Sequence, residues 1–120
     1  MSLEKIKKLS DELMRINGVI GVVFSSSDGL PIFTTLVDSD LEEKSAALSA
    51  VLAEVGDRAL KELLEKDHSW IGIYAPDSSG VIVVKINENS NLMVIFDKEA
   101  KLGVLLYTIK NVISQLNKKE

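Results

Sequence analysis

The stretch Ser39–Lys66, SDLEEKSAALSAVLAEVGDRALKELLEK, is the longest uninterrupted helical pattern in the chain. Ser39 with Glu42 three residues later matches the capping box that often marks a helix start. Further acidic residues lie in the first turn, where the helix dipole favours negative charge. The pattern predicts one long helix over residues 39–66, lying between two β-like regions.

Successive residues of a helix lie about 100° apart, which separates the apolar side chains of this segment into two stripes about 140° apart. The first stripe is bulky, and we expect it to pack on the core of the protein. It consists of Leu41, Leu48, Leu52, Val55, Ala59 and Leu63. The second stripe is richer in small residues. It consists of Ala46, Ala50, Ala53, Asp57, Leu60 and Leu64. A helix on one sheet usually needs a single apolar stripe, so the second predicts a seam for another helix, most simply from a second subunit.

Two points about the second stripe remain open at this stage. Alanine is a good helix former, so its abundance can reflect helix propensity alone. Asp57 can be a solvated helix residue, a polar group that sets the register of a helix–helix seam, or a contact to a partner.

Composition narrows the class of protein. A chain of 120 residues, of which 46% are hydrophobic, is expected to form a single domain over residues 1–120 with a hydrophobic core. Its net charge of −4, without a basic cluster, argues against a nucleic-acid surface. There is no cysteine, no apolar leader and no apolar run of membrane-spanning length, so we expect a cytoplasmic protein that is not inserted in a membrane.

The rest of the chain predicts two further helices and five strands. A helix is expected over residues 2–16, and a hairpin follows, with strands at 19–25 and 30–37 joined by a turn that contains Asp28-Gly29. Pro31 places the second strand at a sheet edge. Three strands with short turns follow the long helix, at residues 69–75, 81–86 and 91–96, and Asp97 is expected to cap a final helix.

The strands at 81–86 and 91–96 are apolar on both faces, which is typical of a sheet that is covered on both sides. We therefore expect an α+β fold with the order α-β-β-α-β-β-β-α. The two terminal helices would cover one face of a five-stranded antiparallel sheet, and the central helix would lie alone on the other.

No catalytic, cofactor or metal motif is recognisable. His68 is the only histidine, so a histidine-based metal site cannot be built, and we interpret His68 as a polar residue at the end of the long helix. Ser25, Ser26 and Ser27 lie beside Asp28 without a base in the local sequence. In the strand at 69–75, Trp70 and Tyr74 share one face, either as core residues or as an exposed aromatic hot spot.

The segment GVIGVVFSSSDGLPIF, residues 18–33, followed by the long helix and the three strands, resembles the Roadblock (dynein light chain) family. The pair Leu102-Gly103 early in the last helix is also similar. The resemblance implies a profilin-like sheet in the strand order 2-1-5-4-3. It also implies a homodimer in which the third strands pair edge to edge and the central helices lie together. The expected interface residues are the second stripe (Ala46, Ala50, Ala53, Asp57, Leu60, Leu64) together with Ser69, Ile71 and Ile73.

Members of this family bind or regulate small Ras-like GTPases, serve as light chains of motor complexes or act as scaffolds. The resemblance supplies no catalytic residue. The length of the chain favours the prokaryotic-type members, which often accompany a small GTPase. The leading hypothesis is a non-enzymatic homodimer that regulates such a GTPase. The alternatives are a structural scaffold or light chain that pairs with homologous chains, and a small-molecule sensor, which the apolar runs disfavour because they lack a polar cluster.

Overall fold

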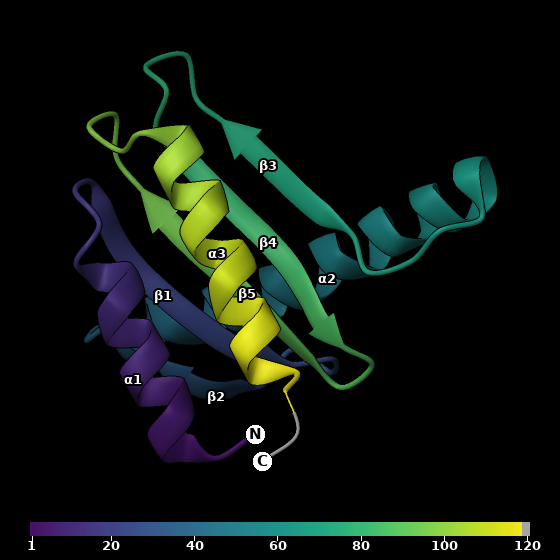
Figure 1. Ribbon diagram of the computed structural model, residues 1–120, viewed down its shortest axis with the longest axis horizontal. Helices are drawn as coiled ribbons and strands as arrows, with labels where there is room; N and C mark the ends of the chain where they lie inside the picture. Colours follow the sequence, from purple (N-terminus) through teal and green to yellow (C-terminus); the bar gives the residue numbers. More distant parts are fainter. Residues whose placement is uncertain (119–120) are drawn as a thin grey trace.

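The computed structural model describes residues 1–118, which form three helices and one five-stranded sheet (Figure 1). In chain order the elements are α1 (Leu3–Met14), β1 (Val19–Ser26), β2 (Pro31–Thr34), α2 (Ser39–Leu64), β3 (Trp70–Tyr74), β4 (Gly80–Asn87), β5 (Ser90–Phe96) and α3 (Leu102–Leu116). The predicted α-β-β-α-β-β-β-α order is confirmed.

All neighbouring strands are antiparallel, and the order across the sheet is β2-β1-β5-β4-β3. This is the order that the family resemblance implies. The strands β2 and β3 are therefore the two edges. Pro31 begins β2, in agreement with its predicted edge position, because proline has no N–H to donate to a further strand.

The helices cover the two faces of the sheet unequally (Figure 1). The helices α1 and α3 lie on one face, and α2 crosses the other. Side chains alternate between the faces along each strand, so each face has its own core. Phe24, Leu92 and Val84 lie in the core beneath α1 and α3. Val23, Met93 and Val83 lie beneath α2.

Two helix starts differ from the sequence prediction. Asp38, not Ser39, is the N-cap of α2, and its Oδ1 accepts a hydrogen bond of 3.0 Å from the backbone N–H of Leu41. Asp97 does not cap α3. Its carboxylate accepts from the N–H of Glu99 in the preceding turn, and Lys101 is the N-cap without a side-chain bond. Asp38 thus caps α2 from the extended residue just before the helix, whereas Asp97 stabilises the turn that precedes α3.

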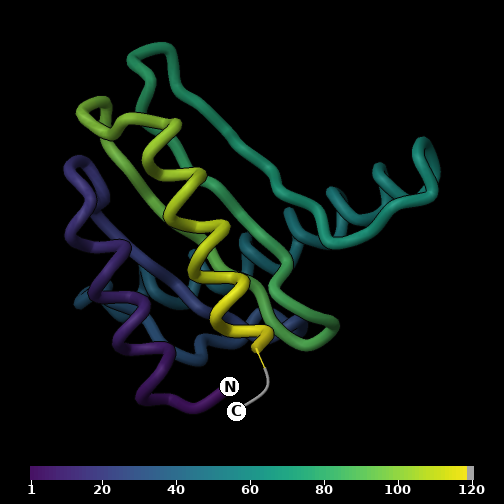
Figure 2. The backbone as a smooth tube through the Cα atoms, in the orientation of Figure 1, coloured from purple at the N-terminus to yellow at the C-terminus, as the bar shows by residue number. Residues whose placement is uncertain are grey.

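The last turns of α2 run past the edge of the sheet. Figure 2 shows this end of the helix extending beyond β3. Every residue from 61 to 68 is exposed. An apolar pair at this end, Leu63 and Leu64, is 79% and 63% exposed, so no residue of the described range 1–118 covers it.

Candidate functional site

The outward face of α2 is an apolar surface that the described residues 1–118 leave uncovered. Leu48, Val51 and Val55 lie one helical turn apart on this face, and each is more than half exposed (56%, 56% and 58%). Leu41 and Leu63 extend the same stripe toward the two ends of the helix. An exposed apolar surface of this kind typically marks a protein–protein contact.

The assignment of the two α2 stripes from the sequence was wrong. The bulky stripe, which we expected in the core, is exposed apart from Leu52, which is partly buried against the core beneath α2. Ala46 and Ala53 of the small stripe are buried against the sheet, at 0% and 4% exposure. They pack on Val23, Met93 and Val83, whose side chains already fill the space between helix and sheet. Small residues on α2 therefore allow a close approach to the sheet rather than to a second helix.

The helix α2 approaches the β3 region closely at Gly56. A methyl group built on Gly56 would lie 2.5 Å from Ser69 Oγ and 2.6 Å from Ile71 Cδ1. Such distances are shorter than van der Waals contact, so a larger side chain would force the neighbours to move. The absence of a side chain at Gly56 allows the helix to pack directly on the strand that forms the sheet edge.

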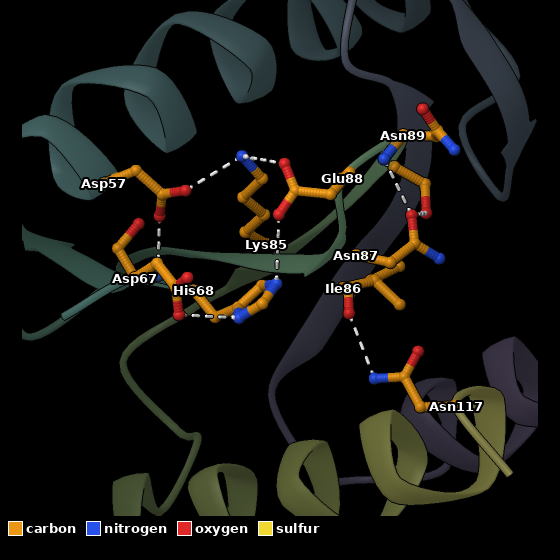
Figure 3. Close-up of polar contacts among 11 residues, drawn as sticks. Asp57, Asp67, His68, Lys85, Ile86, Asn87, Glu88, Asn89 and Asn117 are labelled. Carbon is orange, nitrogen blue, oxygen red and sulfur yellow. Dashed lines mark hydrogen bonds and ion pairs between the residues drawn. The ribbon is translucent and has the colours of Figure 1, made fainter.

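Asp57 ties α2 to the two neighbouring strands (Figure 3). Its Oδ1 accepts a hydrogen bond of 2.7 Å from the backbone N–H of Ser69, just before β3. Its Oδ2 lies 2.9 Å from Nζ of Lys85 on β4, and both side chains are more than four-fifths buried. None of the three roles considered for Asp57 describes this arrangement. Asp57 is an internal clamp between the helix and the sheet.

The clamp shifts the titration of both charged groups. Partial burial acts to raise the pKa of the Asp57 carboxyl, but the hydrogen bonds from Lys85 and Ser69 outweigh it and hold that pKa below its ordinary value. The hydrogen bond from the Asp57 carboxylate in turn raises the pKa of Lys85. Both shifts mean that the charged pair is the stable form at neutral pH.

His68 lies beside this clamp on the connection between α2 and β3 (Figure 3). Its Nδ1 is 3.0 Å from Asp67 Oδ1, and its Nε2 is 3.7 Å from Glu88 Oε1. Its side chain is 46% exposed, as befits a polar residue at the end of a helix. The backbone of His68 has a φ of 57°, in the left-handed region, where the chain reverses direction into β3.

The outer edge of β3 is the second open part of the surface. In the sheet that residues 1–118 form, β3 pairs only with β4, so its other side carries unpaired backbone groups. The strand contains neither lysine nor proline, which usually protect an exposed edge. Ile73 is 46% exposed and, by strand alternation, points to the same face of the sheet as α2.

The structure separates the predicted interface residues into two groups. Ala46, Ala53 and Ser69 are buried within the chain and cannot form an outer contact. The remaining predicted residues, Ala50, Asp57, Leu60, Leu64, Ile71 and Ile73, are partly or largely exposed. Sequence reasoning missed Leu48, Val51 and Val55 as surface residues. One signal in the sequence was available. Lys85 is the single charged residue of the apolar strand 81–86, and Asp57 is the single charged residue of the small stripe, so a pair between them would place this stripe against the sheet.

Residues 1–118 contain neither a metal-binding cluster nor a membrane-spanning helix. No three histidine, cysteine, aspartate or glutamate side chains gather closely enough there to hold a metal ion. In the same range, no helix is both long enough and apolar enough to cross a membrane. The exposed α2 stripe and the β3 edge are thus the features that call for a functional explanation.

Comparison with known families supports this view of the fold. Residues 5–96 match the Roadblock/LC7 domain. The chain belongs to the Roadblock/LC7 family. Comparison with curated protein sequences gave no match.

Solved structures of Roadblock/LC7 proteins are similar to the chain over most of its length. The Roadblock/LC7 domain from Streptomyces avermitilis has a TM-score of 0.82 and 23% identity, and the match covers 91% of this chain and 92% of that one. MglB from Myxococcus xanthus has a TM-score of 0.82 and 20% identity, covering 97% and 94%. LokiProfilin2, in a complex with rabbit actin, matches with a TM-score of 0.60 and 16% identity over 97% of both chains. At these identities the likeness concerns the fold, which is profilin-like.

Proposed function

We propose that this Roadblock/LC7 protein is a cytoplasmic homodimer that binds and regulates a small Ras-like GTPase without an enzymatic activity of its own. The observation that carries the proposal is the apolar outer stripe of α2 beside the unpaired edge of β3. The two features adjoin on one side of the molecule. A single partner surface that supplies a strand and a helix can cover both.

A second copy of the chain fits this requirement. If two β3 strands pair edge to edge, their free N–H and C=O groups satisfy one another and the two sheets become continuous. The α2 helices then lie side by side, because each extends beyond its own β3 (Figure 1). Leu48, Val51 and Val55 would line the seam, with Leu60, Leu64 and Ile73 nearer the strands.

The homodimer can be tested by size-exclusion chromatography with light scattering. The unmodified protein is expected to have twice the mass of one chain at micromolar concentration. Leu48→Glu and Val55→Glu place charges in the seam and should yield monomers. Tyr107→Glu is the matched control, because Tyr107 is 69% exposed on α3, which lies on the opposite face of the sheet from α2. A monomeric parent protein, or seam variants that stay dimeric, would refute the placement.

The GTPase part of the proposal rests on the family and on the polar side of α2. This exposed arc carries Glu43, Glu54, Arg58, Lys61 and Glu62. In a dimer, two such arcs flank the apolar seam and form a charged surface for a partner protein. We expect regulation to work by positioning the catalytic groups of the GTPase itself. Arg58 of α2 is exposed and contacts Glu62, with its Nε 3.4 Å from Glu62 Oε1. This long contact does not hold Arg58 in place as an arginine finger would need.

Hydrolysis by a small Ras-like GTPase from the same organism separates this function from its alternative. A regulator should change the rate of GTP hydrolysis or nucleotide exchange in proportion to the dimer present, and the monomeric Val55→Glu variant should not. A structural scaffold or light chain, which pairs with homologous chains through the same stripe, would bind without altering either rate. Absence of both binding and rate change across the organism's small GTPases would exclude the proposal.

A further inference from the structure

A second open surface lies on the opposite face of the sheet, over β3. The register pairs Phe24 with Leu92, Leu92 with Val84 and Val84 with Trp70, which forms one row across four strands. The first three members of the row are fully buried beneath α1 and α3, whereas Trp70 is 41% exposed. The helical layer thus ends before β3, as Figure 1 shows.

The uncovered strand carries aromatic residues on this face. Trp70, Gly72 and Tyr74 alternate with the isoleucines that point toward α2. Tyr74 is 51% exposed and contacts Phe96, with ring centroids 6.2 Å apart. Of the two interpretations of Trp70 and Tyr74 from the sequence, the structure supports the exposed one.

These aromatic residues form the floor of a groove whose wall is α3. At one end, a hollow of about 400 Å³ lies between Trp70, Ile86 and Ile113. At the other end, a hollow of about 460 Å³ lies between Tyr74, Phe96 and Leu102. Leu102, Leu106, Lys110 and Ile113 recur at spacings of four, four and three, so they lie on the same side of α3. Leu106 and Lys110 thus lie between Leu102, which lines one hollow, and Ile113, which lines the other.

The charge of the groove differs from that of the whole protein. The chain has a net charge of −4. Among the described residues that line the two hollows, none is acidic, and Lys85, Lys98 and His68 are present. Lys110 is the only charged residue of α3, and it is exposed. Lys85 is paired with Asp57, and His68 lies against Asp67 and Glu88. Lys98 and Lys110 therefore supply the charge that an approaching group would meet.

We propose that this groove binds an amphipathic helix of a partner protein, with acidic residues beside its apolar face. Packed helices lie about 8–10 Å apart, which is roughly two strand spacings. A helix placed at that distance from α3 would lie over β3 and complete the layer. Tryptophan and tyrosine are the residues most often found at the centre of such contacts. Groove-to-groove pairing of two copies is disfavoured, because it would bring lysines against lysines.

This binding site is separate from the proposed dimer and GTPase surfaces. Pairing of two β3 edges uses backbone groups in the plane of the sheet, whereas Trp70 and Tyr74 project from that plane. The groove variants described below should therefore keep the mass of the parent protein. This difference distinguishes failure of the groove proposal from failure of the homodimer.

The experiment selects ligands from a phage-displayed library of random 16-residue peptides, with the intact protein as the target. The enriched peptides are expected to carry net negative charge and leucine-like residues at helical spacing. Trp70 is the only tryptophan of the chain, so its fluorescence reports on the groove directly. Addition of an enriched peptide, chosen without tryptophan, should shift the emission of Trp70 to shorter wavelength as the peptide covers the indole.

Variants then locate the binding site. Lys110→Glu and Trp70→Ala should each weaken binding of a fluorescein-labelled peptide tenfold or more. Lys8→Glu makes the same charge change at an exposed position of α1 and should leave the affinity unchanged. The proposal is overturned if no peptide is enriched, if the enriched peptides are basic, or if the groove variants bind as well as the control. A shift of Trp70 with vesicles that contain 30% phosphatidylserine, and not with peptides, would instead show a membrane contact and also overturn it.

Discussion

Removal of the Asp57 carboxylate should destabilise the protein more than removal of any exposed acid. In Asp57→Ala, the buried N–H of Ser69 loses its acceptor, which is worth about 1–3 kcal/mol. Lys85 keeps its pair with Glu88, at 3.8 Å. That carboxylate is 76% exposed, so the remaining pair contributes about 1 kcal/mol at most. The loss of the shorter, mostly buried pair adds about 1 kcal/mol or more, and we expect a total of about 2–4 kcal/mol.

The assay is urea unfolding followed by far-UV circular dichroism, at one protein concentration for every variant because dimerisation changes apparent stability. A thermal melt of the same variants gives a second measurement. The entropy of unfolding is about 2.1 cal/mol/K per residue, so for 120 residues a loss of 2–4 kcal/mol in unfolding free energy corresponds to a drop in Tm of roughly 8–16 °C. Asp40→Ala is the control. Its pair with Lys44 is also 2.9 Å long, but the side chains are 74% and 66% exposed. Its loss should therefore cost about 0.5 kcal/mol.

A double-mutant cycle with Lys85→Met isolates the pair itself. The two single substitutions should be less than additive when combined, with a coupling energy of about 1–3 kcal/mol. Additive effects would show that the two groups do not stabilise each other. A loss for Asp57→Ala no larger than for Asp40→Ala would refute the clamp as a whole.

The same pair predicts how stability depends on pH. The pKa of Asp57 is lower in the folded protein than in the unfolded chain, so its contribution is present above the ordinary carboxyl range and is lost as the pH falls below about 4. The pKa of Lys85 is raised on folding, so its contribution is present below about pH 10 and is lost at higher pH. The stability difference between the parent and Asp57→Ala should be constant near neutrality and shrink at both extremes.

Three further substitutions test the packing and the proposed function. Ala53→Leu overfills the space between α2 and the sheet and should cost about 1–3 kcal/mol in urea unfolding, whereas Ala47→Leu, on the exposed side, should change little. Gly18→Ala should destabilise by at least about 1 kcal/mol, because Gly18 has a φ of 92° and a methyl group there would collide with the backbone of Ala100; an unchanged urea midpoint would contradict this. Arg58→Ala should leave the dimer mass intact and reduce GTPase stimulation modestly, and a loss above a thousandfold would instead identify an arginine finger.

Much of the fold follows from local patterns in the sequence. Asp28-Gly29 marks the first hairpin, the short polar turns mark the second and third, and strands apolar on both sides require cover on both faces of the sheet. These features involve neighbouring residues, so the sequence shows them directly. The residues that cap α2 and α3 were assigned wrongly, because two or more polar residues near each helix start are able to cap.

The orientation of α2 could not be predicted in the same way. Because α2 has two apolar stripes, either stripe could face the sheet. Which one does so depends on the size of the side chains on the strands opposite the helix. Val23, Met93 and Val83 are large enough to fill the gap, so alanine and glycine fit and leucine does not. Asp57 and Lys85 are far apart in the sequence, and their pairing follows only once α2 is placed over β4. The orientation of α2 and the pairing of Asp57 with Lys85 therefore both depend on how the helix packs on the sheet in three dimensions.

The strand β3 connects the two surfaces for which we propose partners. Because side chains alternate along a strand, Ile71 and Ile73 point toward α2 and the proposed dimer seam, while Trp70 and Tyr74 point into the groove beside α3. Neighbouring substitutions should therefore separate the two activities: Ile73→Glu should disrupt the dimer and spare peptide binding, and Tyr74→Ala should do the reverse. The Asp57 clamp holds the start of this strand from the α2 side, so Asp57→Ala should weaken both. If Ile73→Glu and Tyr74→Ala had the same effects, the two faces of β3 would belong to one surface, and the separation argued from the register would be wrong.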